Sequence, residues 1–188
     1  MRLGCGHYNL RRLILIFGRK PLVQSDLVGQ HGFVAEQDVI YVGGGNTAHL
    51  LALWRLHGLD TILRDAWLGG TVLSGVSAGM LCWFAAGVTD SFGAGLAPLH
   101  DGLGLIAGSA CPHYDGEAAR RPRYHELVAS GFPAGYAADD GAALVFEGAT
   151  ATLTEVVASR PRAAGYRVEL RDGAVVEDRL PARLVTAR

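Results

Sequence analysis

The sequence predicts an α/β fold in which a mostly parallel sheet is flanked by helices and short antiparallel strands fill the C-terminal third. Two segments, 38–57 and 71–84, each read as a buried strand followed by a tight glycine turn and a helix. Repeated units of this kind favour parallel strands, because each helix returns the chain to the same end of the sheet. After Gly135 short strands alternate with turns, which is typical of antiparallel pairing.

The individual elements follow from apolar patterning and turn residues. The region from Gly87 to Gly108 is rich in glycine and is expected to form a loop or short irregular elements. No repeat or linker divides the chain, so we expect one domain spanning residues 1–188. Strands are predicted at 13–17, 38–42, 71–75, 142–146, 151–157, 166–170 and 174–177, and helices from Asn46 or Thr47 to Gly58, at 61–68, after Ser77 and at 123–130.

The composition is that of an ordinary globular protein. The formal charge is -1 and the apolar fraction is 49%, which gives no electrostatic reason to expect nucleic acid or a membrane as a partner. The longest apolar runs are too short to span a bilayer and no signal peptide is evident, so a cytoplasmic location is expected. The 3 cysteines are widely spaced and are expected to be reduced packing residues, not a disulfide or zinc framework.

The segment Gly75-Val-Ser-Ala-Gly79 matches the G-x-S-x-G pattern of a nucleophile elbow. In such an elbow a serine lies on a sharp turn between a strand and a helix, and small neighbours let the backbone adopt a strained conformation. The free N–H groups at the start of the helix then stabilise developing negative charge. Ser77 is therefore a candidate nucleophile; the alternative is an ordinary tight turn.

A serine nucleophile needs a base and a carboxylate that orients the base. His113 follows Pro112 in a stretch that does not look helical, and it is the first candidate for the base, with His100 second. Asp90 is one of two acids between Ser77 and His113, and the other, Asp101, reads as a turn residue. We therefore predict a triad of Ser77, Asp90 and His113; Asp90 is alternatively a loop cap.

The glycine loop 43–45 lacks the G-x-G-x-x-G pattern and the lysine of a phosphate-binding loop. We prefer to interpret it as part of an oxyanion hole, in which the N–H of Gly44 or Gly45 acts together with the N–H of Ala78. A tight connection between strand and helix is the alternative, and both can hold at once.

Four motifs in this order together resemble the peptidase E family of serine peptidases, the aspartyl dipeptidase group related to cyanophycinase. The resemblance runs from about residue 38 to the end of the chain and includes 139–144. It implies a fold akin to class I glutamine amidotransferases, Ser77 as nucleophile, His113 as base, Asp90 as the acid, and neither metal nor organic cofactor. The four motifs are Tyr41-Val-Gly-Gly-Gly-Asn-Thr47, Gly75-Val-Ser-Ala-Gly79, Thr89-Asp-Ser91 and Cys111-Pro-His-Tyr114.

The resemblance also implies a small peptide substrate. In the aspartyl dipeptidases an arginine after the catalytic histidine binds the acidic N-terminal side chain, which points here to Arg120 first and Arg123 second, with Asn46 as a further substrate contact. A solvated helix start is the alternative for this arginine run. The favoured activity is hydrolysis of dipeptides with an N-terminal Asp through an acyl-enzyme. A broader di- or tripeptidase, an esterase or an Asp-Arg polymer hydrolase, and an inactive binding module, remain alternatives.

Members of this family usually carry a strand and a helix ahead of the segment that resembles residues 13–17. Either the gene model is short, or the sheet is reduced. A reduced sheet has an exposed edge that another element or a second copy must cover, so a homodimer is the expected partnership.

Overall fold

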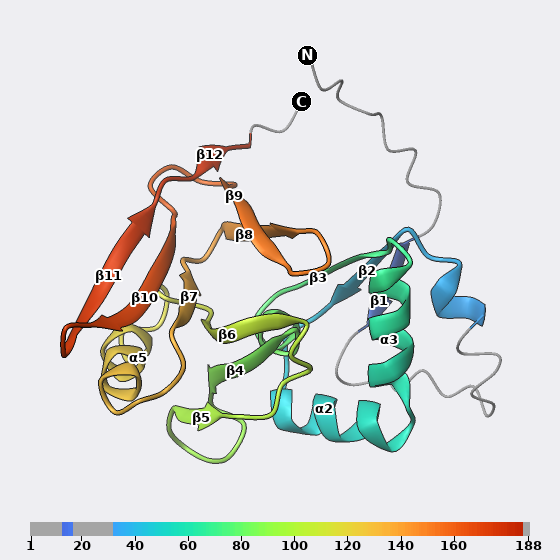
Figure 1. The fold of residues 1–188 in the computed structure, drawn as a ribbon, viewed down its shortest axis with the longest axis horizontal. Helices are drawn as coiled ribbons and strands as arrows, with labels where there is room; N and C mark the ends of the chain where they lie inside the picture. Colours follow the sequence, from blue (N-terminus) through green and yellow to red (C-terminus); the bar gives the residue numbers. More distant parts are fainter. Residues whose placement is uncertain (1–12, 17–31, 186–188) are drawn as a thin grey trace.

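The structure is a computed structural model that describes residues 13–16 and 32–185. Three predictions concern residues outside this part: that Cys5 is a reduced packing residue, that Phe17 ends the first strand, and that the N-terminal part of the sheet is reduced. Within it the strands form three sheets (Figure 1). The first is parallel, in the order β1-β2-β3. It consists of β1 (Leu13–Ile16), β2 (Val39–Val42) and β3 (Val72–Gly75), with helices α2 (Thr47–Leu56) and α3 (Leu59–Leu68) in the connection between β2 and β3.

The second sheet is mixed and has the order β11-β10-β7-β6-β4-β5. Its central strands β4, β6 and β7 are parallel, whereas β5, β10 and β11 pair antiparallel with their neighbours. The strands are β4 (Phe84–Thr89), β5 (Ala97–Leu99), β6 (Ile106–Cys111), β7 (Gly135–Ala138), β10 (Gly165–Arg171) and β11 (Ala174–Leu180), and helix α5 (Arg120–Ala129) connects β6 to β7.

The third sheet, in the order β12-β9-β8, lies beside the first two (Figure 1). Strands β8 (Ala142–Glu147) and β9 (Thr152–Ala158) are antiparallel, and β12 (Arg183–Leu184) pairs parallel with β9. The predicted antiparallel pairing in the C-terminal third is therefore confirmed for β8 with β9 and for β10 with β11.

Three expectations need correction. The sheet is not a single, mostly parallel one, because the strands divide into three sheets and the largest is mixed. The glycine-rich region 87–108 forms loops for more than half of its length, as predicted, but it also contains the second half of β4, all of β5 and the first half of β6, which were not predicted. The helix after Ser77, α4 (Ala78–Leu81), has only 4 residues. Short strands of small residues such as β6 lack the apolar alternation that identifies a strand in a sequence.

Three buried apolar clusters among the described residues hold the parallel strands in place, and the two larger ones include the long helices. Helices α2 and α3 pack on β2 through Leu51, Leu63 and Val42, and the same core includes Trp83 beside β4. Helix α5 packs on the second sheet through a core that contains Tyr124. The cores fix the ends of β3, β6 and β7, and the chain segments that leave these ends carry the candidate site residues.

None of the helices in the described ranges is both long and apolar enough to cross a membrane.

Candidate active site

Ser77 lies on a sharp turn between β3 and α4, as the motif predicts. Its backbone has φ 58° and ψ -116°, a conformation that residues with a side chain rarely adopt. Such a residue costs about 1–3 kcal/mol and persists only where its surroundings impose it. The side chain is half-buried and its hydroxyl makes no hydrogen bond within the described residues. The turn therefore presents the Ser77 hydroxyl without a competing partner.

The two glycines of the motif are required by space. A Cβ atom at Gly75 would lie 2.4 Å from the carbonyl oxygen of Gly79, and one at Gly79 would lie 2.0 Å from the carbonyl oxygen of Val42. Both oxygens belong to the backbone, so neither can move aside without disturbing β2 or the elbow. The small residues of G-x-S-x-G thus let α4 start directly against the end of β2.

We expect Gly79→Ala to destabilise the fold by about 2–3 kcal/mol, because the added methyl group meets backbone that cannot repack. Urea denaturation followed by circular dichroism measures this loss. Gly95→Ala is the matched control, since a Cβ at Gly95 meets no atom within 4 Å. Equal stability of the two variants would show that the elbow can accommodate a methyl group at residue 79.

The glycine loop faces the nucleophile. A Cβ atom built on Gly44 would lie 3.4 Å from Cβ of Ser77 and 3.8 Å from its Oγ, so the backbone of Gly44 passes directly beside the hydroxyl. The N–H groups of Gly44, Gly45 and Ala78 donate no hydrogen bond to any residue that the structure describes. Free donors on both sides of a serine hydroxyl are the arrangement that an oxyanion hole needs.

The motif Thr89-Asp-Ser91 holds this loop in place. Ser91 Oγ accepts hydrogen bonds from the N–H groups of Thr47 (2.9 Å) and Ala48 (3.3 Å) at the start of α2. Asn46 caps the same helix, because its Oδ1 accepts from His49 N–H at 2.8 Å, and its Nδ2 donates to Ser91 O at 3.0 Å. Asn46, predicted as a substrate contact, therefore ties the glycine loop to the end of β4.

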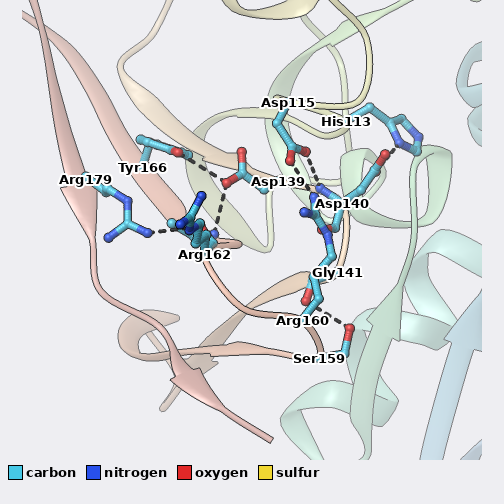
Figure 2. A network of polar contacts seen from close by, with 11 residues as sticks. His113, Asp115, Asp139, Asp140, Gly141, Ser159, Arg160, Arg162, Tyr166 and Arg179 are labelled. Atoms are coloured by element: carbon cyan, nitrogen blue, oxygen red, sulfur yellow. Dashed lines mark hydrogen bonds and ion pairs between the residues drawn. The ribbon is translucent and has the colours of Figure 1, made fainter.

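His113 follows β6 and has φ 55°, so a second residue of the candidate site adopts a strained backbone conformation. Its Nδ1 lies 2.7 Å from Oδ1 of Asp140 (Figure 2). With Nδ1 donating to a carboxylate, Nε2 is the nitrogen that can accept a proton. The structure thus supplies a histidine whose tautomer is set by an acid.

The acid that pairs with His113 is Asp140 and not Asp90, which was the candidate from the sequence. Asp90 follows the end of β4, and its side chain is exposed and makes no hydrogen bond to His113. Strands β4 and β7 lie on opposite sides of β6. After β6 the chain turns toward β7, since Tyr114 N–H donates to Ala138 O at 3.1 Å, and His113 therefore meets the acid that follows β7.

A signal for Asp140 was present in the sequence, in the segment Asp139-Asp140-Gly141 that follows a short apolar run. The adjacent Asp139 has a different role, because its buried carboxylate accepts hydrogen bonds from Ala164 N–H (3.0 Å) and Tyr166 OH (3.2 Å). Burial raises the pKa of Asp139, with the hydrogen bonds opposing it. Two neighbouring acids thus separate into one that faces His113 and one that anchors the chain.

Other groups near the site are less suited to nucleophilic or metal chemistry. The Cys111 thiol lies two residues before His113, but burial raises its pKa to about 12, so it stays protonated near neutral pH. In the described part of the chain, no three His, Cys, Asp or Glu side chains are grouped so that they could hold a metal ion. Ser77 is the side chain at this edge that best fits a nucleophile.

The predicted substrate arginines make contacts within the protein. Arg120 is buried, with its side chain 3% exposed, and its guanidinium donates to Val88 O at 2.8 Å and to Glu117 at 2.7 Å. Arg123 is more exposed, and it donates to Leu96 O at 3.2 Å. Both side chains therefore hold β4 and the loop after it.

Comparison with known proteins shows that the sequence of this chain is similar to peptidases. The sequence model of peptidase family S51 matches residues 23–154, a range that includes residues 77, 113 and 140. The uncharacterized peptidase YgaJ of Bacillus subtilis (strain 168) is 54% identical over 160 residues, and the match spans 85% of this chain and 66% of that protein. A 1.5 Å crystal structure of a candidate peptidase E protein from Listeria monocytogenes EGD-e has 18% identity and a TM-score of 0.48, over 84% of this chain and 67% of that chain.

Proposed function

The chain belongs to peptidase family S51, and from this membership we propose that it is a serine peptidase that hydrolyses short peptides. Ser77 is the nucleophile, His113 the base and Asp140 the acid that orients the base. The observation that carries the proposal is the 2.7 Å bond between His113 Nδ1 and Asp140 Oδ1, formed by a histidine in the family-matched region that also holds the strained Ser77 elbow.

The reaction follows from the roles of these groups. His113 Nε2 takes the proton of the Ser77 hydroxyl as Oγ attacks the scissile carbonyl carbon. The N–H groups of Ala78 and of Gly44 or Gly45 stabilise the oxyanion of the tetrahedral intermediate. His113 then returns the proton to the leaving amine, and an acyl-enzyme on Ser77 remains. Water, activated by the same histidine, hydrolyses the ester and restores the serine.

The substrate class is proposed as short peptides in general. The preference for an N-terminal Asp rests on the resemblance to aspartyl dipeptidases, in which an arginine binds the acidic side chain. Here Arg120 and Arg123 both donate to groups of the protein itself. A panel of Asp-Ala, Ala-Ala, a tripeptide and a simple ester tests the proposal. A peptidase should cleave the peptides at least as fast as it hydrolyses the ester. Turnover of the ester alone would replace it with an esterase.

We expect Arg120→Ala to lower the melting temperature and to reduce hydrolysis of Asp-Ala and Ala-Ala to the same extent. The change leaves Val88 O without its donor, and an unsatisfied buried group costs about 1–3 kcal/mol. Differential scanning fluorimetry and kcat/KM on both dipeptides measure the two effects. A selective loss on Asp-Ala would instead assign Arg120 to the recognition of the acidic side chain.

A further inference from the structure

Asp140 is held on both sides of its own backbone by a pair of oppositely charged side chains. Asp115 Oδ1 accepts the Asp140 N–H at 2.8 Å, and Arg160 Nε donates to the Asp140 carbonyl oxygen at 2.6 Å. Arg160 Nη2 also pairs with Asp115 Oδ2, so the three residues form a closed ring (Figure 2). We refer to Asp115 and Arg160 as the Asp140 clamp.

The clamp joins the base and the acid through one short turn. Asp115 lies two residues after His113, and between them Tyr114 N–H donates to Ala138 O at 3.1 Å, two residues before Asp140. The turn that carries the imidazole thus contacts the chain of the carboxylate at two points, Ala138 and Asp140. Any movement of this turn relative to the end of β7 changes the separation of His113 Nδ1 and Asp140 Oδ1.

Arg160, the second residue of the Asp140 clamp, lies in a third segment, the loop between β9 and β10. That loop is itself anchored, because Asp139 Oδ2 accepts the N–H of Ala164 at 3.0 Å and Ser159 N–H donates to Gly141 O at 2.8 Å. The chain therefore fastens the arginine on one side through Asp139 and on the other through Gly141. Both anchors flank Asp140 in the sequence.

Two glycines leave space for this arrangement. A Cβ atom at Gly116 would lie 2.0 Å from Oδ2 of Asp140, so any side chain there displaces the carboxylate that faces His113. Gly141 has φ +81°, and a Cβ atom at that position would lie 3.1 Å from Cγ of Arg160. The space beside Asp140 is thus reserved for its own carboxylate and for the arginine stem.

Folding stability alone does not explain the clamp. The side chains of Asp115 and Arg160 are 36% and 47% exposed, and ion pairs with such exposure contribute little to stability. Burial would raise the pKa of Asp115, but the hydrogen bonds from Arg160 and from the Asp140 N–H outweigh it and lower the pKa, so Asp115 stays ionised as an acceptor. What the pair does fix is geometry, because the guanidinium bridges two acceptors at once.

We propose that Asp115 and Arg160 are positioning residues for catalysis: they hold the backbone of Asp140 so that its carboxylate fixes the tautomer and orientation of His113. The proposal rests on the proposed function, in which Asp140 is the acid of the triad. Both clamp residues act through the backbone of Asp140, to which they are hydrogen-bonded. We expect them to affect kcat and not KM. A misplaced acid stabilises the transition state less well, but it leaves substrate binding unchanged.

The first test compares Arg160→Gln with Arg162→Gln. Both remove one positive charge from the same loop, but Arg160 donates to the Asp140 carbonyl oxygen, whereas the hydrogen bond at Arg162 is one that its backbone oxygen accepts from Arg179. Arg160→Gln is expected to lower kcat about 10- to 50-fold with KM within about twofold, whereas Arg162→Gln keeps the wild-type kcat. Arg160→Lys, which keeps the charge and one donor, recovers part of the loss. An unchanged kcat in Arg160→Gln, or an equal loss in both Gln variants, overturns the proposal.

A mutant cycle separates positioning through Asp140 from any other effect. In the Asp140→Asn background, Arg160→Gln should cause no further loss of kcat, because the group it positions is already disabled. Additive losses would show that Arg160 acts elsewhere and would contradict the clamp. A silent Asp140→Asn variant would instead refute Asp140 as the triad acid, which is a failure of the proposed function.

A spectroscopic measurement tests the clamp without any turnover. In ¹⁵N NMR spectra of the neutral His113 ring, the wild-type protein and Arg162→Gln should show the tautomer protonated at Nδ1, which donates to Asp140. Arg160→Gln should show a mixture of both tautomers, with a melting temperature within about 2 °C of the wild type. An unchanged tautomer in Arg160→Gln counts against the clamp even if the protein proves to have no peptidase activity.

Discussion

Replacement of Ser77 by alanine is expected to lower kcat for peptide hydrolysis by about 10⁴- to 10⁶-fold, because a triad without its nucleophile retains only the contribution of the oxyanion hole and of substrate binding. The fold should remain intact, since the hydroxyl makes no hydrogen bond within the described residues. Hydrolysis of a dipeptide and reaction with a fluorophosphonate probe measure the loss. The strained backbone is set by the glycines around it, so alanine should adopt it as serine does.

Ser74→Ala is the matched control for this experiment. Ser74 lies three residues earlier on β3, and its hydroxyl donates to Ile40 O at 3.1 Å and takes no part in the proposed chemistry. The control should keep both hydrolysis and probe labelling. Undiminished hydrolysis by Ser77→Ala would remove the central claim, and absence of labelling in the wild-type protein would favour a binding module that has kept the fold.

Asp140→Asn is the second change with a large expected effect. The amide keeps the shape of the side chain but cannot hold the imidazolium that forms in the transition state, so kcat should fall about 10²- to 10⁴-fold with little change in KM. The fall in kcat caused by Asp90→Asn should be at least about tenfold smaller than that caused by Asp140→Asn, because the His113 imidazole is hydrogen-bonded to Asp140 and not to Asp90. Steady-state kinetics of both variants on one dipeptide provide the comparison.

The same pair of variants tests the prediction made from the sequence. If Asp90→Asn lowered kcat as much as Asp140→Asn does, with KM unchanged, the result would support the prediction from the sequence that Asp90 is a member of the triad. Circular dichroism of both variants checks that the loss does not come from unfolding. Asp140 is half exposed, which makes a folding defect from this conservative change small.

Local patterns in the sequence predicted the elbow well. The position of Ser77 between a strand and a helix follows from an apolar run, two glycines and a serine, and all of these lie within a few residues. The glycine loop, with Asn46 at the start of α2, was predicted from the same kind of local information, and the structure confirms the Asn46 cap. Such features depend on backbone conformation and close contact, which neighbouring residues determine.

The partner of His113 could not be predicted in this way. Asp90 and Asp140 both leave the same edge of the second sheet, and the choice between them depends on whether the chain after β6 turns toward β4 or toward β7. Two long-range hydrogen bonds hold this turn against β7, one from Tyr114 N–H to Ala138 O and one from Asp140 N–H to Asp115 Oδ1, and sequence spacing carries no information about them. The strands β4 to β6 were missed for a related reason, because glycine and alanine predominate where helices and strands pack closely.

If Ser77 and His113 have the proposed roles, their positive φ angles set catalysis and thermal stability against each other at two positions. Glycine is the residue that relieves such a backbone, and it is also the residue that removes the hydroxyl or the imidazole. Selection for heat resistance alone would therefore tend to erase the site, whereas selection for turnover keeps two energetically unfavourable residues in place. A relative that carries glycine at either position is expected to be more stable to heat and to have a function other than serine-dependent hydrolysis.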